Sequence, residues 1–326
     1  MNVEQILAQF PKLSALIVGD ICLDRWCTYD PEEAEVSRET GIPRIGVVAY
    51  HSTPGAAGTV ANNMIALGIG RVSVMSVIGT DGYSYELLDV MKAGNIESDM
   101  IIRRSSIQTF TYTKLLNLET GEEDLPRVDA INNRPMPSDV DDELVPIFQQ
   151  RAGEFDFIIV SDQAETENGG VVTARMRKAL AEFAEAHPEK VIWVDSRRRI
   201  EHYRGLTLKP NEDEADAACE RIGKPGDYDA LYQHTSARHL IVTRGPLGSV
   251  VLDPDGTRIS GTRAVEKPVD ICGAGDSFSA GGAATLAVTG DPVLASEFGN
   301  LVASITIMQK GTGKASPAQV REAAAQ

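Results

Sequence analysis

Short apolar runs recur along the chain, and each is too short to form a helix. They are rich in valine and isoleucine, which is typical of strands buried on both faces of a sheet. Segments with helical spacing lie between several of them. This alternation predicts right-handed crossovers and a mainly parallel sheet. The expected strands are 15–20, 72–79, 155–162, 190–196, 239–245 and 249–254, and the expected helices are 57–68, 83–93, 169–187, 211–220, 275–289 and 292–309.

Two stretches, 25–50 and 101–131, depart from this pattern because their β-prone residues alternate with polar ones and with turn residues. We interpret them as strands of a small accessory sheet inserted into the main domain. A sheet of this kind over the strand ends would act as a lid. The chain shows no repeat, no low-complexity tract and no linker, so we expect residues 1–326 to form a single domain.

Composition narrows the class of protein. The 326 residues include 31 basic and 47 acidic side chains, a net charge of −16, which argues against nucleic acid as a partner. Hydrophobic content of 42% and charged content of 24% are ordinary for a soluble globular protein. No apolar run approaches the ~20 residues that cross a bilayer, and the N-terminus lacks the pattern of a secretory signal. Four cysteines without zinc-like spacing indicate reduced thiols, so we expect a cytoplasmic protein without a membrane partner.

Polar residues stand at the carboxyl ends of five expected strands. In an open parallel sheet these ends share one edge, and ligands bind beyond it. Each of the five is weak evidence alone, but together they predict a polar rim. The rim residues are Gly19-Asp20, Gly79, Ser161-Asp162, Asp195-Ser196-Arg197 and Thr243-Arg244-Gly245.

The stretch DICGAGDSFSAGG, residues 270–282, is the strongest candidate for chemistry. Gly273 and Gly275 permit unusual backbone angles, which leaves successive N–H groups free to bind one anion at the start of the following helix. Asp276 lies at that start, where we expect the helix dipole to keep it ionised. An anion site beside a carboxylate suits phosphoryl transfer, with Asp276 accepting the proton of the attacking hydroxyl. Alternatively, Asp276 is an ordinary helix cap.

A second pair follows a proline in LKPNEDEA, residues 208–215. Asn211 and Glu214 are three residues apart, the spacing of a capping box. The functional alternative is that both hold water around a Mg²⁺ ion bound to nucleotide phosphates. The two interpretations remain open at this point.

The sequence resembles the ribokinase (PfkB) family of carbohydrate kinases over essentially its whole length. The resemblance is found in VGDICLDR (18–25), PGAAGTVANNMIALG (54–68), SVIGTDG (76–82), KPNEDE (209–214), VTRGPLG (242–248) and DICGAGD (270–276). It implies a three-layer α/β/α fold with a small β-sheet lid, and a kinase that uses ATP and Mg²⁺. Within the family the pattern is most similar to kinases of a heptose 7-phosphate, which implies a sugar or phosphosugar acceptor. The alternatives are a kinase of a free sugar or a nucleoside, and a catalytically silent regulator on the same fold that binds a sugar or a nucleotide.

The resemblance also assigns roles to residues. Asp276 would be the catalytic base, with Gly273, Ala274 and Gly275 as the anion hole. Asn211 and Glu214 would serve Mg-ATP through water, and Asp270 would lie beside the monovalent-cation site that some members have, which implies K⁺. The nucleotide would contact Thr243, Gly245, Gly248 and Asn300, and the sugar would contact Asp24, Gly55 and Asn63. For two of these the open alternatives are that Asp24 is a solvated loop charge and that Gly55 only serves a turn.

Two basic residues suggest that the acceptor already carries a phosphate. Arg197 follows the expected strand 190–196 in DSRRR, and Lys114 lies on an expected lid strand. A chain with a net charge of −16 needs local cations to bind a dianion, and guanidinium groups do so in bidentate fashion. The alternative is that these side chains are solvated and pair with surface acids. We also expect a homodimer joined through the lid, because small open sheets carry unpaired edges that proteins usually cover.

Overall fold

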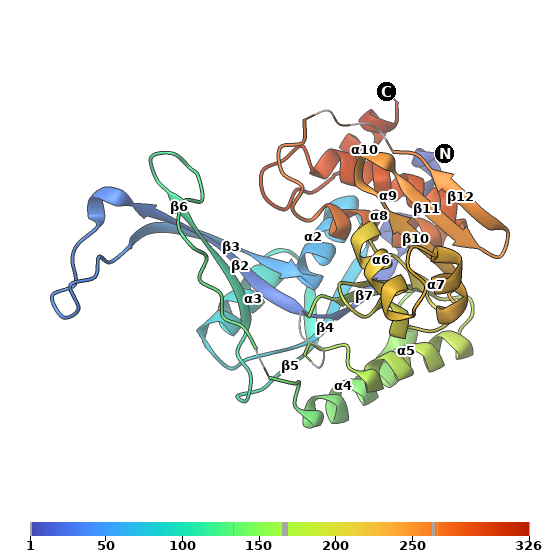
Figure 1. Cartoon of the computed structure of the whole chain (residues 1–326), viewed down its shortest axis with the longest axis horizontal. Helices are drawn as coiled ribbons and strands as arrows, with labels where there is room; N and C mark the ends of the chain where they lie inside the picture. The colour runs from blue at the N-terminus through green and yellow to red at the C-terminus, as the bar shows by residue number, and fades with distance from the viewer. Residues whose placement is uncertain (1, 133, 165–168, 263–264, 266, 326) are drawn as a thin grey trace.

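A nine-stranded sheet forms the centre of the computed structural model, which describes residues 2–132, 134–164, 169–262, 265 and 267–325 (Figure 1). Its strand order is β12-β11-β10-β9-β8-β7-β1-β4-β5, and neighbours from β10 to β5 run parallel. The last two strands, β11 and β12, pair antiparallel. The bounds are β1 (Ser14–Gly19), β4 (Arg71–Ile78), β5 (Glu97–Arg103), β7 (Phe157–Asp162), β8 (Val191–Ser196), β9 (Thr207–Leu208), β10 (His239–Thr243), β11 (Ser249–Asp253) and β12 (Gly256–Ser260).

Helices cover both faces of this sheet, so the expected three layers are confirmed (Figure 1). The sequence of strand β1 is continuously apolar because its alternate side chains pack on opposite faces of the sheet, both of which are covered. Ala15 and Ile17 pack in one core cluster, while Leu16 and Val18 pack in the other. One face is covered by α1 (Val3–Leu7), α2 (Ala57–Leu67), α3 (Gly82–Ala93), α8 (Ala274–Thr289), α9 (Pro292–Thr306) and α10 (Pro317–Ala324), and the other by α4 (Ser138–Arg151), α5 (Ala174–Ala186), α6 (Glu212–Arg221) and α7 (Tyr228–Thr235).

The six expected strands and six expected helices all form, with boundaries shifted by a few residues. The largest shift is at α5, which begins at Ala174 and not at 169. The sequence analysis missed α4, whose first turn is acidic and whose interior contains Pro146. The acidic first turn favours a helix, but the interior proline disfavours one. Leu144 and Phe148 are nevertheless fully buried against the sheet. Tertiary packing therefore overrides local preference in this segment.

The lid is a three-stranded sheet of β2 (Ile21–Asp30), β3 (Gly46–Ala56) and β6 (Phe110–Asn117), which projects from the body in Figure 1. Strand β2 pairs antiparallel with β3 and parallel with β6. The expectation that residues 101–131 lie wholly in the lid is wrong at its start. Residues up to Arg103 belong to β5 and pair with β4 in the large sheet, because their apolar side chains complete its edge.

The expected polar rim forms where the parallel strands end. In neighbouring strands Gly19 is in register with Ser161, and Ser161 with Asp195, so these residues meet at one edge of the sheet. Among the helices that the structure describes, none has the length and apolar character needed to cross a membrane.

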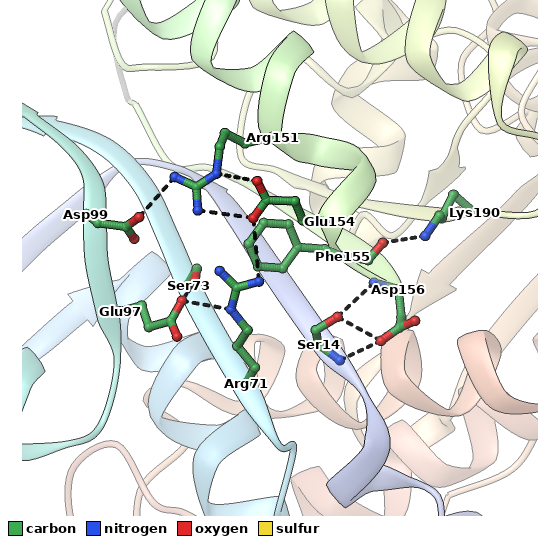
Figure 2. A network of polar contacts seen from close by, with 10 residues as sticks. All are labelled: Ser14, Arg71, Ser73, Glu97, Asp99, Arg151, Glu154, Phe155, Asp156 and Lys190. Carbon is green, nitrogen blue, oxygen red and sulfur yellow. Dashed lines mark hydrogen bonds and ion pairs between the residues drawn. The ribbon is translucent and has the colours of Figure 1, made fainter.

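At the amino ends of the strands, opposite the rim, a network of ion pairs and hydrogen bonds holds the sheet together (Figure 2). Arg71, the first residue of β4, pairs with Glu97 at 2.9 Å and with Glu154 at 3.6 Å, and its guanidinium carbon lies 4.6 Å from the centre of the Phe155 ring. The Ser14 backbone N–H and hydroxyl both donate to Asp156 at 2.7 Å. Because this network lies at the amino ends of the strands, it stabilises the sheet far from the rim.

We predict that Arg71→Met lowers the free energy of unfolding by about 1–2 kcal/mol, since it removes two ion pairs and a cation–π contact. Chemical denaturation measures the effect. The control Arg175→Met breaks an exposed pair with Asp142 and should cost under about 0.5 kcal/mol. Equal losses in the two variants would contradict a structural role for the network.

Candidate active site

The glycine-rich loop before α8 has a conformation that requires glycine at its turn. Gly273 is the N-cap of α8 with φ of +77°, in the left-handed region. The Asp270 carboxylate accepts from the backbone N–H groups of Cys272 at 2.9 Å and Gly311 at 3.0 Å, which holds the loop in place. Asp270 is thus a loop anchor in the structure, and a monovalent cation beside it stays a prediction.

The amides at the start of α8 are the groups that can bind an anion. The N–H of Ala274 donates to the Ile271 carbonyl at 3.2 Å and is therefore already used within the turn. The N–H groups of Gly275 and Asp276 belong to the first turn, where a helix has no carbonyl partner to offer. The anion hole expected at Gly273, Ala274 and Gly275 stays a prediction, and of its N–H groups that of Ala274 is already used within the turn.

Asp276 does not cap the helix. Gly273 occupies the cap position, and the Asp276 carboxylate makes no hydrogen bond to a residue that the structure describes. Instead, Asp276 lines a pocket of about 270 Å³ between the lid and the end of the sheet. The other lining residues are Asp24, Trp26, Ala56, Thr59, Tyr112, Lys114, Arg127, Gln163, Arg197, Cys272, Gly273, Gly311 and Thr312.

The charge state of Asp276 differs from the expectation that the helix dipole keeps it ionised. Burial and the nearby Asp195 carboxylate raise the pKa of Asp276 to about 7, while Lys209 and Arg197 act in the opposite direction. At neutral pH the group therefore exchanges a proton readily. A carboxylate with a pKa near the working pH is well matched to general-base catalysis.

A buried ion pair lies beneath the loop, and the sequence analysis gave it no role. Lys209 Nζ is 2.6 Å from Asp195 Oδ2, both side chains are almost fully buried, and the Ser279 hydroxyl donates to the same oxygen at 3.1 Å. A Cβ atom placed on Gly275 would be 3.4 Å from Lys209 Nζ, so the ammonium group lies directly against the start of α8. Burial disfavours the charged lysine, but Asp195 and Glu214 outweigh it and raise the pKa of Lys209 above its usual value.

Asn211 and Glu214 form the capping box of α6. The Asn211 side chain accepts from the Glu214 N–H, and the Glu214 carboxylate accepts from the Asn211 N–H, both at 2.8 Å. The capping interpretation is thus confirmed, and it leaves Glu214 Oε1 without a partner among the described residues. Burial and then Asp195 raise the pKa of Glu214, while Lys209 lowers it.

The donor set near Glu214 fits a magnesium ion that is shared with phosphates. Among the described residues there is no cluster of three or more metal-ligating side chains. Mg²⁺ usually keeps several waters and takes only one or two carboxylates besides substrate phosphates. One oxygen of Glu214 is therefore a sufficient protein contribution.

Of the residues expected along the nucleotide, Asn211 and Thr243 are neighbours at the start of α6, whereas Asn300 lies apart on α9. Asn211 forms a β-bridge with Thr243 at the end of β10. Gly248 has φ of +81°, and a Cβ there would lie 2.2 Å from the Ser260 carbonyl oxygen, so the turn after Gly245 requires glycine at 248. Asn300 donates to the Gly261 carbonyl at 3.2 Å and lines a separate pocket with Gly261.

The acceptor side of the pocket centres on Asp24 of β2. Burial raises the pKa of Asp24 to about 6, although the Cys22 thiol and then Lys114 and Arg127 favour its charged form. Gly55 has a specific reason to be glycine, since a Cβ there would come within 2.5 Å of both Asp24 carboxylate oxygens. Asp24 is thus a pocket residue and not a solvated loop charge.

Two of the three expected sugar contacts, Gly55 and Asn63, are not among the residues that line this pocket. Asn63 is instead held inside α2. It is fully buried, its side-chain nitrogen donates to the Thr59 carbonyl at 3.0 Å, and its oxygen has no partner among the described residues. Thr59, one turn earlier in α2, lines the pocket instead.

The arginines of DSRRR have three different environments. Arg197 and Arg198 are both exposed, and Arg197 also lines the pocket near Asp276. Arg199, to which the sequence analysis gave no role, is buried and pairs with Asp162 at the end of β7. The Tyr203 hydroxyl donates to the same carboxylate at 2.8 Å. No local signal marks this pairing, because 37 residues separate Arg199 from Asp162.

A lid over a pocket, backbone N–H groups at a helix start and a buried carboxyl group are features that phosphoryl-transfer enzymes use. Residues 21–319 match the description "pfkB family carbohydrate kinase". The chain belongs to this family, and it is therefore a phosphotransferase that acts on a sugar hydroxyl with ATP and a divalent metal.

Curated relatives match along nearly the whole chain. The chain is 26% identical over 334 residues to the bifunctional protein HldE of Pelobacter propionicus, which covers 99% of this chain and 66% of that protein. It is 27% identical over 329 residues to HldE of Geobacter sulfurreducens, with 98% and 64% covered. The chain thus spans about two thirds of the length of these relatives.

Solved structures confirm the fold. Ribokinase from Thermotoga maritima superposes with a TM-score of 0.69 at 19% identity, covering 96% of this chain and 100% of that one. Phosphofructokinase-2 from Escherichia coli, solved in complex with potassium, gives a TM-score of 0.72 at 17% identity, with 96% and 98% covered.

Proposed function

We propose that the protein transfers the γ-phosphate of ATP to a hydroxyl of a phosphorylated sugar of the heptose 7-phosphate kind. The observation that carries this proposal is the composition of one pocket, where Asp276 and Asp24 face the cations Lys114, Arg127 and Arg197. A carboxylate pair can orient and deprotonate a sugar hydroxyl. Lys114 pairs with Glu123 at 3.6 Å and Arg127 with Asp129 at 3.0 Å. In this proposal the dianion of the acceptor competes with these carboxylates for the cations. The HldE proteins, similar over 94% or more of this chain, support the same acceptor class.

Asp276 acts as the base in this proposal. Its carboxylate accepts the proton of the attacking hydroxyl, and Asp24 orients the sugar by accepting hydrogen bonds from neighbouring hydroxyls. Gly55 leaves room for the Asp24 carboxylate itself, which a Cβ at this position would displace. The pKa of about 7 lets Asp276 take up the proton and release it again at neutral pH.

The charge on the transferred phosphoryl group is stabilised from below the loop. The Lys209 ammonium lies against Gly275, at the start of α8, so that its charge acts together with the N–H groups there. Asn211, Thr243, Gly245, Gly248 and Asn300 contribute to the nucleotide side, and Glu214 would hold Mg²⁺ through water. Mg²⁺, when bound, neutralises part of the phosphate charge.

Replacement of the base tests the reaction. We predict that Asp276→Asn lowers turnover by ~10²–10⁴-fold, typical of losing a positioned proton acceptor, with ATP binding nearly intact. An ADP-release screen over free and phosphorylated sugars, including heptose 7-phosphate, measures it. Below pH 7 the wild-type kcat/KM should fall about tenfold per pH unit, because Asp276 becomes protonated there.

The exposed Asp89 on α3 provides a matched control, and Asp89→Asn should retain full turnover. More than a tenth of the wild-type activity in Asp276→Asn would show that another group is the base. If no sugar releases ADP with the wild-type protein, the proposed function is wrong.

The basic side chains test the phosphosugar assignment. We predict that Lys114→Ala and Arg197→Ala each reduce the preference for a phosphosugar over its free sugar by ~1–3 kcal/mol, as for hydrogen bonds to charged groups. The measurement is the ratio of kcat/KM values for the two substrates. Lys178→Ala, at an exposed position of α5, serves as the control. Equal losses on both substrates, or a wild-type preference for the free sugar, would exclude this role.

We also propose that the lid joins two copies of the chain. Strand β3 is an edge of the lid sheet, and its residues 47–51 are all exposed. Val48 and Tyr50 are 51% and 62% exposed, an uncovered apolar edge of the kind that proteins normally bury. Sedimentation at micromolar concentration should give twice the 35.1 kDa chain mass, and Val48→Lys should give a monomer. A monomeric wild-type protein would contradict the proposal.

A further inference from the structure

The lid has two faces, and only one of them lines the pocket of the candidate active site. In neighbouring strands Asp24 is in register with Tyr112 and Trp26 with Lys114, and all four side chains line the pocket. Successive residues of a strand point to opposite faces. Arg25, between Asp24 and Trp26, therefore points away from the pocket. On that side the lid packs against α3, which contacts both β2 and β3 (Figure 1).

Glu86 of α3 is the centre of the contact between this helix and the lid. Its carboxylate pairs with Arg25 of β2, whose Nε is 3.5 Å from Oε2, and it accepts a hydrogen bond from the Ser52 hydroxyl of β3. Arg25 and Ser52 are in register on their two strands, so one carboxylate binds both strands at the same level. The Arg25 and Glu86 side chains are 19% and 24% exposed, and partial burial reduces the screening of such a pair by salt.

Two tyrosine rings complete the contact around the Arg25 guanidinium. Tyr83 lies one turn before Glu86 on α3, and Tyr50 lies two residues before Ser52 on β3. The guanidinium carbon is 5.3 Å from the centre of each ring, which is within the range of a cation–π interaction. We call these five residues the lid latch. It joins three side chains of the lid to two of the body.

Hydrophobic packing leaves the position of the outer lid to contacts of this kind. Cys27, Tyr29 and Leu115 form a small buried cluster within the lid. Among the described residues this cluster is separate from the two large core clusters of the body. The body therefore holds this part of the lid through polar contacts, of which the lid latch is the largest group on the side of α3.

We propose that Glu86 is a positioning residue, which holds β2 from behind through Arg25 so that Asp24 reaches the acceptor. This inference rests on the proposed function, because it takes the pocket as the acceptor site. The apparent affinity for the acceptor falls with the fraction of chains whose lid is in the binding position. Breaking the lid latch lowers this fraction, and a bound acceptor restores it by contacting Asp24. The loss should therefore appear in the affinity for the acceptor and not in turnover at saturating acceptor.

Steady-state kinetics of the full chain measure this split, with the sugar that releases most ADP in the screen as the acceptor. Arg25→Met should raise the KM of the acceptor about tenfold, because it removes the ion pair and both cation–π contacts. Glu86→Gln keeps the shape of the side chain and removes only its charge, so it should raise this KM about threefold. In both variants the KM of ATP and the turnover at saturating acceptor should stay within about twofold of the wild type.

Trp26 reports the position of the lid without any substrate. The chain has two tryptophans, and the other, Trp193, is fully buried in the core. A Cβ atom placed on Gly311 of the body would be 3.9 Å from Cζ2 of Trp26, so movement of the lid away from the body exposes this ring. Quenching of the fluorescence by acrylamide should therefore increase in Glu86→Gln and in Arg25→Met. The increase should disappear when Trp26→Phe is added, because only Trp193 then emits.

Glu35→Gln is the matched control, since Glu35 pairs with Arg44 at 3.1 Å within the lid. It should keep the wild-type quenching and the wild-type KM of the acceptor. Wild-type quenching in Arg25→Met, a wild-type KM of the acceptor, or a loss of turnover at saturating acceptor as large as the loss of affinity would each overturn the proposal.

The outcomes separate the two proposals. A protein that phosphorylates a sugar, but shows wild-type KM and quenching in both lid-latch variants, would have the proposed function and no positioning role for Glu86. A protein that phosphorylates no sugar, but shows increased quenching of Trp26 in both variants and not in Glu35→Gln, would have the lid latch and not the proposed function.

Discussion

The ion pair between Lys209 and Asp195 is the interaction on which the site depends. It joins the end of β8, the segment before α6 and the start of α8, so one contact fixes three elements that are far apart in sequence. Two charges taken out of water are stable only when they stay paired, and removing one partner leaves the other uncompensated. The same pair sets the electrostatics around Glu214 and Asp276, because each feels the lysine as well as the aspartate. The Lys209–Asp195 pair therefore both holds the three segments together and shifts the pKa values of the neighbouring carboxyl groups.

Local signals in the sequence were sufficient to identify Asp276 and the pair Asn211 and Glu214 as candidate site residues. Asp276 was identified because glycines at a helix start have few other uses, and the pairing of Asn211 with Glu214 follows from their spacing alone. The partners that the sequence did not reveal are those that only the fold brings together, such as Lys209 with Asp195 and Arg127 with the acceptor pocket. The pKa of Asp276 was missed for the same reason, since burial by distant segments determines it.

The lid shows a similar division between local and tertiary information. Alternating polar and apolar residues identified its strands, but the pattern could not tell which sheet a strand joins. The segment ending at Arg103 pairs with β4 in the large sheet, while β6 pairs parallel with β2. This parallel pairing requires the chain to pass through the body between the two strands. As a result, the lid and the body are built from interleaved segments, and the pocket between them has walls from both.

Three carboxyl groups around the pocket hold their protons more tightly in the folded chain than in an unfolded one. Burial raises the pKa of Asp20 and Asp24 to about 6 and that of Asp276 to about 7. Between about pH 4 and pH 7 the folded state therefore binds more protons than the unfolded state at these groups, and their contribution to stability falls as the pH rises. Below about pH 4 both states are protonated, and above pH 7 the loss is complete. Folding near neutral pH consequently takes up protons from the solvent.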